Sequence, residues 1–388
     1  MNPALSQYLE RHLGDIKRAN LYRQRRQVQG AHGVEVQVDG ETKTVFCSND
    51  YLGLTTHPEL ISAAQRSVAD FGVGSGASQL VTGHNHVHRA LEDELAEFTG
   101  RDRALYFATG TMTNMGVIQA LVGKGDTVFS DALNHASLID GIRLSGADRQ
   151  VYAHADVEAL QKLISVGSQG QRLLVSDAIF SMDGDIAPLN DLVALAQTHD
   201  AALMIDDAHG FGVMGDHGQG VAAQFDPSEI PVLVATLGKS AGVAGAFVAG
   251  SDSLIEYLIQ RARSLIYTTA PPPALAQTAR AALALMKKES WRRHRLHELI
   301  RRFRRGAGQL GITLSESNTP IQPLVLGDEA SALRMSEYLW AAGIWVTAIR
   351  PPTVPVGSSR LRITLSAAHD ESQVDRLLET LSAGLQRC

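Results

Sequence analysis

The feature that most constrains the fold is a series of short apolar segments that recur between helical patterns after residue 100. These segments are apolar at nearly every position, instead of alternating apolar and polar residues. A strand of this kind is covered on both faces, which is typical of a parallel sheet with helices on both sides. The predicted strands are 104–107, 127–130, 172–176, 201–205, 231–236 and 245–249, and the predicted helices are 58–70, 87–99, 112–122 and 190–198. The sequence therefore predicts an α/β fold with a mainly parallel sheet.

Two different patterns flank this region. Residues 1–28 place leucine and isoleucine at helical spacing, so we expect an N-terminal helical arm. Residues 34–38 alternate apolar and polar side chains before Asp39 and Gly40, a pair typical of a tight hairpin turn. We therefore expect the arm and a β-hairpin to occupy residues 1–45, ahead of a large cofactor-binding α/β domain.

The pattern changes again after the three prolines at 271–273. Long helical stretches follow, and then short strands alternate with helices in the way of a smaller α+β domain. The predicted strands there are 321–325, 344–347 and 361–365, and the predicted helices are 329–341 and 370–385. We place the large domain at 46–280 and the small C-terminal domain at 281–388.

Composition excludes several classes of protein. Hydrophobic residues make up 44% and charged residues 20%, as in ordinary globular proteins. The net charge of −6 argues against nucleic-acid binding, and no apolar stretch reaches the ~20 residues of a membrane span. The two cysteines, Cys47 and Cys388, cannot form a disulfide framework, and no residues stand at metal-ligand spacing. We expect a cytoplasmic protein without a metal site.

Lys239 is the strongest candidate for a catalytic residue. It follows the apolar strand 231–236, so a primary amine lies at the tip of a buried strand, where desolvation lowers an ammonium pKa and frees a nucleophile. Asp206 and His209 follow the neighbouring strand 201–205, and ligands bind where parallel strands end. An amine and a carboxylate at one sheet edge suit pyridoxal 5'-phosphate, whose aldehyde binds lysine and whose ring nitrogen needs an acid.

One alternative uses the same segment differently. Residues 238–242 also match the nucleophile elbow of an α/β-hydrolase, in which Ser240 would be the nucleophile. His369 would then have to serve as the base, and it lies in the small domain instead of after a sheet strand. A visible absorption band in the purified protein would separate the two hypotheses, because a serine hydrolase has none.

A set of motifs in order along the chain identifies a family. The motifs are Ser48-Asn-Asp-Tyr-Leu-Gly53, Gly74-Ser-Gly-Ala-Ser78, His135-Ala-Ser137, Phe180-Ser-Met-Asp-Gly-Asp185, Asp206-Asp-Ala-His-Gly210 and Thr236-Leu-Gly-Lys239. With these motifs, the chain resembles the α-oxoamine synthases, which are pyridoxal phosphate enzymes of the aminotransferase-like fold type I. The resemblance covers nearly all 388 residues.

The resemblance implies roles for residues around the cofactor ring. Lys239 would form the Schiff base with the aldehyde and later move protons, and Asp206 would pair with the ring nitrogen. His135 would stack on the ring. His209 would hydrogen-bond the phenolic oxygen, and Ser181 would lie near the same atom.

The resemblance also implies a phosphate site that two subunits share. Gly110 and Thr111 start a helix and would offer backbone N–H groups to the phosphate, and Thr236 would add a hydroxyl. Thr268 and Thr269 would reach across from a second subunit. A homodimer with its active site at the interface is therefore expected.

Three residues are implied in substrate binding. Arg362 would clamp the amino-acid carboxylate with its planar guanidinium, unless it is a surface residue at a strand edge. Asn49 would orient the same carboxylate, and Arg23 would meet the far end of the acyl substrate. The chain departs from the family at Asp177, where a glutamate is usual.

The C-terminal motifs narrow the expected reaction. Residues 345–355 and 360–365 resemble those members that condense L-alanine with a pimeloyl thioester in biotin biosynthesis. The carrier of the pimeloyl group would be coenzyme A or acyl carrier protein. Glycine C-acetyltransferase and 5-aminolevulinate synthase activities remain open as alternatives. In each case the chain would be a pyridoxal phosphate-dependent acyltransferase.

Overall fold

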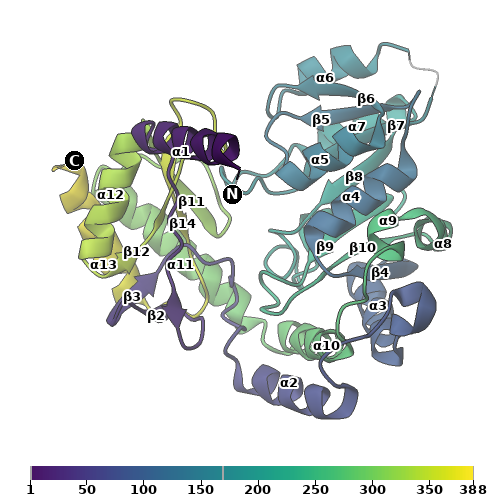
Figure 1. The fold of residues 1–388 in the computed structure, drawn as a ribbon, viewed down its shortest axis with the longest axis horizontal. Coiled ribbons are helices and arrows are strands. Elements are labelled where there is room, and N and C mark those ends of the chain that lie inside the picture. The colour runs from purple at the N-terminus through teal and green to yellow at the C-terminus, as the bar shows by residue number, and fades with distance from the viewer. Residues whose placement is uncertain (1, 168–169, 388) are drawn as a thin grey trace. The chain divides into compact units, whose positions relative to one another are not determined.

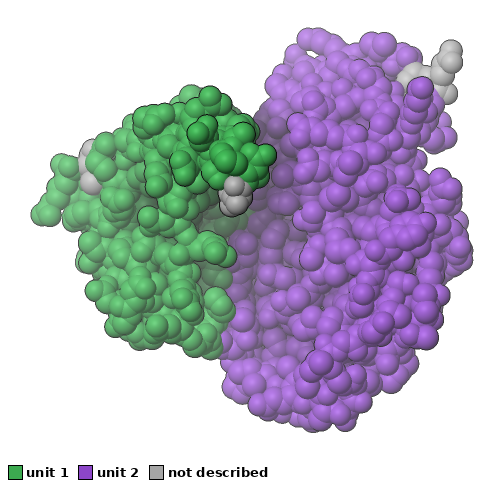
Figure 2. All heavy atoms as spheres, viewed as in Figure 1, with its two compact units in different colours: residues 1–48, 182–184, 295–388 green, residues 49–181, 185–294 purple. Residues whose placement is uncertain are grey.

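The computed structural model describes residues 2–167 and 170–387, so Met1 of the expected arm and the second cysteine, Cys388, lie outside the described residues. Contacts between Cα atoms divide the chain into two compact units, which Figure 2 colours separately. Unit 1 combines the residues up to Ser48 with Met182–Gly184 and the residues from Arg295 onward. Unit 2 contains Asn49–Ser181 and Asp185–His294. The three-part division expected from the sequence stays a prediction.

Unit 2 contains one seven-stranded sheet and most of the helices (Figure 1). Its strands are β4 (Arg103–Phe107), β5 (Thr127–Asp131), β6 (Asp148–Tyr152), β7 (Arg172–Asp177), β8 (Ala202–Asp206), β9 (Val232–Thr236) and β10 (Ala246–Gly250). Its α-helices are α2 (Pro58–Phe71), α3 (His86–Thr99), α4 (Gly110–Leu121), α5 (Ala136–Ser145), α6 (Val157–Ile164), α7 (Leu189–Thr198), α8 (Asp252–Arg261), α9 (Arg263–Ile266) and α10 (Pro273–Lys288). A short π-helix, Gln79–Gly83, and a short 3₁₀-helix, Val221–Gln224, also belong to the unit.

The sheet is mainly parallel, as predicted. Its strand order is β4-β10-β9-β8-β7-β5-β6, and only β10 runs antiparallel to its two neighbours. The sequence analysis missed β6 because this edge strand, Asp148-Arg-Gln-Val-Tyr152, is polar and buries only its last residue. An edge strand does not need the continuous apolar sequence that identified the central strands.

Apolar side chains on both faces of the sheet are buried. One face packs Leu105, Val128, Val175, Val234 and Val248 into a single core with residues of α4, α5, α8 and α9. The residues that alternate with them, including Tyr106, Phe129, Leu174, Leu233 and Phe247, are buried too. Burial of both faces explains why these strands are apolar throughout, and the α/β prediction is confirmed.

Unit 1 contains two smaller sheets. Its strands are β1 (Val28–Gln29), β2 (Glu35–Val38), β3 (Glu41–Val45), β11 (Ile321–Gly327), β12 (Ile344–Trp345), β13 (Thr347–Ile349) and β14 (Ser359–Thr364), and its helices are α1 (Pro3–Arg18), α12 (Glu329–Ala341), α13 (Glu371–Leu385) and most of α11 (Trp291–Gln309). The sheet orders are β1-β2-β3-β12 and β11-β14-β13. The predicted hairpin is confirmed, since Asp39 and Gly40 connect β2 to β3 with φ values of 54° and 80°.

Two predictions in unit 1 were wrong in detail. The N-terminal helix ends at Arg18 instead of residue 28, and Asn20 follows it with a left-handed φ of 56° that cannot continue a helix. Arg350 holds the next stretch by donating to the carbonyl groups of Asn20 and Tyr22. The predicted strand 344–347 is divided, because β12 pairs with β3 whereas β13 pairs with β14.

Candidate active site

Lys239 lies at the carboxyl edge of the unit 2 sheet, where the sequence placed it. β9 ends at Thr236, and Lys239 follows three residues later, half-buried. Asp206 is the last residue of the adjacent strand β8, and the turn after it carries His209. The Lys239 Nζ lies 2.8 Å from His209 Nε2. The structure therefore brings the predicted amine and imidazole into direct contact.

A chain of hydrogen bonds continues from Lys239 into the interior. His209 Nδ1 lies 2.7 Å from the Tyr51 hydroxyl, and that hydroxyl donates to Asn49 Oδ1 over 3.2 Å. Because an amide oxygen can only accept, His209 Nδ1 must then donate to the Tyr51 oxygen, and Nε2 accepts from Lys239. Tyr51 is fully buried and was missed by the sequence analysis, although it stands within one of the recognised motifs.

Asp206 is held by two donors. Its Oδ2 accepts from Asn114 Nδ2 over 2.6 Å, and its Oδ1 accepts from the Ala208 N–H over 3.0 Å. Asn114 lies in α4, is buried, and also donates to Ser137 Oγ. No sequence signal distinguished Asn114, because nothing in its neighbours along the chain shows that α4 crosses the end of β8.

His135 is positioned through its backbone by Asp177. The His135 N–H donates to Asp177 Oδ2 over 2.6 Å, while its ring, at the N-cap of α5, is exposed. Asp177 is the last residue of β7 and stands in register with Asp206 of β8. Burial raises the pKa of Asp177 well above its usual value, and the nearby charge of Asp206 raises it further. The aspartate that replaces the usual glutamate therefore fixes the residue predicted to stack on the ring.

The predicted phosphate-binding residues lie at the start of α4 and the end of β9. The Thr109 side chain caps α4 by accepting from Met112 N, and the first N–H groups of a helix lack intrahelical partners. The Thr236 hydroxyl donates to Gly245 O and accepts from Gly238 N. Ala246 of β10 pairs with Thr236, and a Cβ built on Gly110 would lie 4.0 Å from the Ala246 Cβ. Gly110, Thr111 and Thr236 thus belong to one corner of the sheet.

The remaining predicted residues of unit 2 lie in turns. Ser181 follows Phe180, whose N–H donates to the carbonyl of Asp185 and closes the turn. Thr268 is half-buried and Thr269 is exposed, in a segment that Ala270 anchors by donating to the Ala77 carbonyl over 2.9 Å.

Arg362 and Arg23 belong to unit 1. Arg362 is 7% exposed on β14, the central strand of its sheet, so the alternative of an edge surface residue is wrong. Arg360, two residues earlier on the same face, donates to the Met182 carbonyl and pairs with Asp183. Arg23 is exposed and lies 3.5 Å from both the Pro351 carbonyl oxygen and Thr353 Oγ1. The roles proposed for Arg23, Asn49 and Arg362 stay predictions.

The structure argues against the hydrolase alternative. The Ser240 hydroxyl is fully buried and has no hydrogen-bond partner within the described ranges, whereas a nucleophile elbow exposes its serine. His369 is already engaged, since Nδ1 accepts from Ser366 N and Nε2 donates to the Val45 carbonyl. Across residues 2–167 and 170–387, no cluster of three or more His, Cys, Asp or Glu could hold a metal ion.

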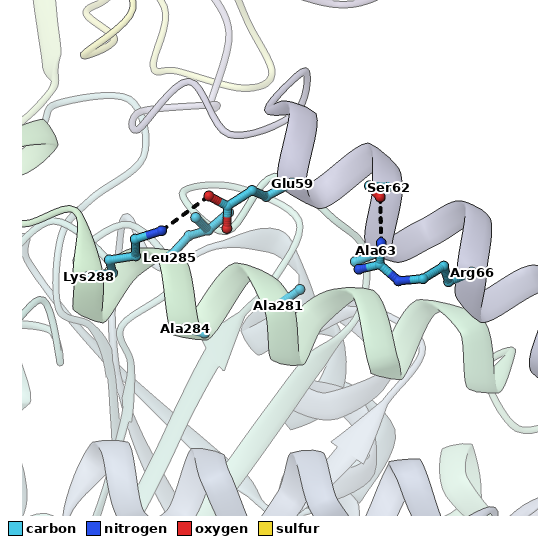
Figure 3. A pocket seen from close by; sticks show the side chains of 8 residues that line it. All are labelled: Glu59, Ser62, Ala63, Arg66, Ala281, Ala284, Leu285 and Lys288. Carbon is cyan, nitrogen blue, oxygen red and sulfur yellow. Dashed lines mark hydrogen bonds and ion pairs between the residues drawn. The ribbon is translucent and has the colours of Figure 1, made fainter.

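A separate hollow of about 280 Å³ lies between α2 and α10 (Figure 3). Glu59, Ser62, Ala63, Arg66, Ala281, Ala284, Leu285 and Lys288 line it. Lys288 Nζ pairs with Glu59 Oε1 over 3.1 Å, and Arg66 donates to Ser62 over 2.5 Å. None of the residues that the sequence singled out lies here.

The groups at the sheet edge fit pyridoxal phosphate. The half-buried amine suits the aldehyde, and the buried carboxylate suits the ring nitrogen. The exposed imidazole can cover the face of the ring, and the N-terminus of α4 suits the phosphate. The buried Asn114 Oδ1, next to Asp206, has no partner among the described residues. An unfilled acceptor beside the carboxylate is consistent with a polar ligand at this position.

Comparisons with known proteins agree with this geometry. The profile of the family "Aminotransferase class I and II" matches residues 41–381. The 8-amino-7-oxononanoate synthase of Nitrosococcus oceani is 55% identical over 93% of this chain and 97% of its own length, and that of Methylococcus capsulatus is 55% identical over 95% and 96%. A serine palmitoyltransferase from S. paucimobilis with bound PLP and myriocin has a TM-score of 0.93, 30% identity and 98% coverage of both chains. An 8-amino-7-oxononanoate synthase from Francisella tularensis has a TM-score of 0.78 and 30% identity, over 88% of this chain and 97% of its own.

Proposed function

We propose that this chain, which belongs to the class I and II aminotransferase family, condenses L-alanine with a pimeloyl thioester to 8-amino-7-oxononanoate, with release of CO₂ and the free thiol. It is a pyridoxal phosphate-dependent acyltransferase of biotin biosynthesis, like the relatives with which it shares more than half of its residues. The observation that carries the proposal is the contact between Lys239 and His209 beside Asp206 at one sheet edge.

The cofactor supplies an electrophilic aldehyde and, through its protonated ring nitrogen, an acceptor for the electron pair left at Cα. Lys239 would hold the aldehyde, and once its amine is free it would take the Cα proton of alanine and later return a proton to that carbon. Asp206 would keep the ring nitrogen protonated, since an adjacent carboxylate favours the cationic form. Asn114 and the Ala208 N–H leave Asp206 fixed for this pairing.

His209 would donate from Nε2 to the phenolic oxygen of the cofactor. For that tautomer its Nδ1 has to accept, and the Tyr51 hydroxyl can turn from Asn49 to supply the proton. His135 would cover the ring, held by Asp177 through its backbone. The first N–H groups of α4 and the Thr236 hydroxyl would bind the phosphate, and Ser181 would lie near the phenolic oxygen.

Arg362 would bind the alanine carboxylate together with Asn49, and Arg23 would bind the far carboxylate of the pimeloyl group. A buried guanidinium is suited to this task because its planar fork matches a carboxylate with two hydrogen bonds.

A homodimer is part of the proposal, with Thr268 and Thr269 of one subunit completing the phosphate site of the other. Large apolar side chains next to this segment are exposed in the single chain: Tyr267 by 72%, Val81 by 73% and Leu80 by 52%. An exposed apolar cluster of this kind is typical of an interface. A sedimentation experiment that gives a monomer with full activity would contradict this part.

The pimeloyl carrier would be an anion, either coenzyme A or acyl carrier protein. The first 28 residues carry six Lys or Arg against two Asp or Glu, although the whole chain carries 35 against 41. These six side chains, Arg11, Lys17, Arg18, Arg23, Arg25 and Arg26, are exposed. A basic surface of this kind speeds association with an acidic partner, and the rate falls as salt is added.

No helix within the described residues is long and apolar enough to cross a bilayer. We place the reaction in the cytoplasm, because the chain offers two cysteines and no disulfide framework.

The test is a panel of amino acids and acyl thioesters, scored by product, CO₂ release and change of the visible absorption band. L-Alanine with pimeloyl thioester should give the highest kcat/KM, with either carrier. Higher turnover of glycine with acetyl or succinyl thioester, or of serine with palmitoyl thioester, would overturn the proposed substrates while leaving the cofactor assignment intact.

A further inference from the structure

His154, the second residue after β6, lies between two carboxylates from different segments of unit 2. Its Nδ1 is 3.0 Å from Asp131 Oδ1, and its Nε2 is 2.9 Å from Asp185 Oδ2. The ring also meets Phe180 edge-on, with centroids 4.3 Å apart and an interplanar angle of 84°. Because both ring nitrogens face acceptors, both have to donate, and this requires the cationic imidazolium.

The two carboxylates stabilise that cation. The hydrogen bond to Asp131 and then the hydrogen bond to Asp185 raise the pKa of His154 to about 10, against the opposing effect of burial. Two further titratable groups face Asp131: burial raises the pKa of Tyr152 and that of Asp177, and the charge of Asp131 raises both further. His154 is therefore a cation throughout the neutral pH range, although no step of the proposed reaction uses it.

Asp131 shapes the turn that leads to His135. It is the last residue of β5 and is nearly completely buried, and besides His154 it accepts from the N–H groups of Leu133 and Ala155. Leu133 lies two residues before His135. The turn that presents the ring-stacking histidine is thus built around a buried carboxylate whose charge His154 neutralises.

Asp185 closes the turn that carries Ser181. Its carbonyl accepts the Phe180 N–H over 3.1 Å, so the backbone returns to the same point after the turn. The Asp185 Oδ2 bonds His154, whereas its Oδ1 is buried and has no hydrogen-bond partner among the described residues. Without His154, this carboxylate would lose its cationic partner in a partly buried position.

We propose that His154 is a positioning residue that ties the Asp131–His135 turn to the Phe180–Asp185 turn and so sets how His135 and Ser181 face the cofactor. The inference rests on the proposed function, because those two residues are assigned through it. His154 itself does not touch substrate or cofactor. Its effect is expected in the geometry of the bound ring and in the rate, more than in the affinity for alanine.

The test compares His154→Gln, Asp185→Asn and the double variant. His154→Gln can keep one hydrogen bond but loses the charge, and Asp185→Asn removes the charge of the partner with almost no change in shape. We measure the visible circular dichroism of the bound cofactor, its dissociation constant, and kcat and KM separately. Each single variant should change the dichroism amplitude and lower kcat about 3- to 30-fold, with KM for alanine changed less than 3-fold. The kcat of the double variant should be no lower than that of the less active single variant, because the three side chains act as a unit.

A matched control is His57→Gln. His57 also pairs with a carboxylate, Glu289, at 3.6 Å, and the other side-chain hydrogen bonds of this pair are with the Glu59 N–H and Arg292, which belong to neither turn. The control should keep the wild-type dichroism and kcat. Unchanged dichroism and kcat in both single variants would overturn the inference, as would losses that multiply in the double variant. Failure of the proposed function would be distinguishable from failure of this inference, because the wild-type protein itself would then give no cofactor band or no product from alanine.

Discussion

The carboxyl edge of the unit 2 sheet and the hollow between α2 and α10 both carry charged side chains, but these side chains differ in burial and in the number of their hydrogen-bond partners. At the sheet edge, His209 is 5% exposed and Asp206 6% exposed, and each bonds two further groups. In the hollow, the Glu59 and Lys288 side chains are 59% and 66% exposed and form a single pair. A buried polar group is costly to leave without its partner, whereas an exposed ion pair contributes little. We therefore expect substitutions at the sheet edge to impair catalysis, and substitutions in the hollow to have little effect.

Substitution of Lys239 tests the edge most directly. Lys239→Ala removes the amine proposed to hold the aldehyde and to move the Cα proton, so we expect kcat to fall by about 10³-fold or more. Product formation under saturating alanine and pimeloyl thioester measures the effect, and the absorption band of the covalently bound cofactor should be lost. Lys162→Ala on α6, an exposed lysine, is the control and should behave as wild type. Turnover by Lys239→Ala within tenfold of wild type would disprove the assignment.

Substitution of Arg362 tests whether a buried polar side chain outside the sheet edge also contributes to function. It is as buried as the groups of the sheet edge, but it lies on β14 in unit 1. Arg362→Lys keeps the charge and loses the planar fork, so we expect KM for L-alanine to rise about 10- to 100-fold while kcat changes less. Steady-state kinetics measures both constants. Arg334→Lys, on the exposed side of α12, is the matched control. An unchanged KM would remove Arg362 from the substrate site.

The same contrast explains what could be predicted from the sequence. The central strands of unit 2 were recognisable because both faces are buried, and burial leaves a continuous apolar pattern. Lys239 and Asp206 could be placed at one edge because each follows such a strand, and parallel strands end together. The polar edge strand β6 and the true end of α1 at Arg18 could not, since neither depends on an apolar periodicity.

Residues that act through long-range contacts were not predictable in the same way. Asn114 reaches Asp206 across 92 positions of the chain, and Tyr51 reaches His209 across 158. His154 stands in an ordinary polar stretch, and only the fold brings Asp131 and Asp185 to its two nitrogens. Sequence patterns indicate which helix or strand a residue belongs to. The hydrogen-bond partners of these residues depend instead on which helices and strands lie next to one another in the fold.

Tyr51 tests whether the connected network matters beyond Lys239 itself. Tyr51→Phe keeps the ring and removes the hydroxyl between His209 and Asn49, so the hydrogen bond between His209 Nδ1 and this hydroxyl is lost. One hydrogen bond is worth about 0.5–1.5 kcal/mol, so kcat should fall about 2- to 10-fold. The pH at which the visible band changes should move too, because the histidine proposed to donate to the phenolic oxygen would lose the hydrogen bond at its Nδ1.

Tyr106→Phe provides the matched control for Tyr51. Tyr106 is also buried, and its hydroxyl donates to the Ala244 carbonyl over 3.3 Å without touching His209. Tyr106→Phe should lower the free energy of unfolding by about 0.5–1.5 kcal/mol, the value of one hydrogen bond. Its pH profile for the visible band should be that of wild type. Identical profiles for Tyr51→Phe and wild type would show that the chain of hydrogen bonds ends at His209.

The smallest effect is expected in the hollow of Figure 3, where Lys288→Ala breaks the pair with Glu59. Both side chains are more than half exposed, and water replaces the lost partner of each, so the change in stability should stay below about 1 kcal/mol. kcat and KM should be those of wild type, and thermal unfolding with and without salt measures the rest. A Lys288→Ala variant with a raised KM for the thioester would break the contrast between the two regions, because an exposed pair would then contribute to substrate binding. The kinetics and the cofactor spectrum should stay unchanged in Lys288→Ala, whereas Tyr51→Phe should alter both. That result would show that the site is distinguished by its network of buried hydrogen bonds, and not by the presence of charged side chains alone.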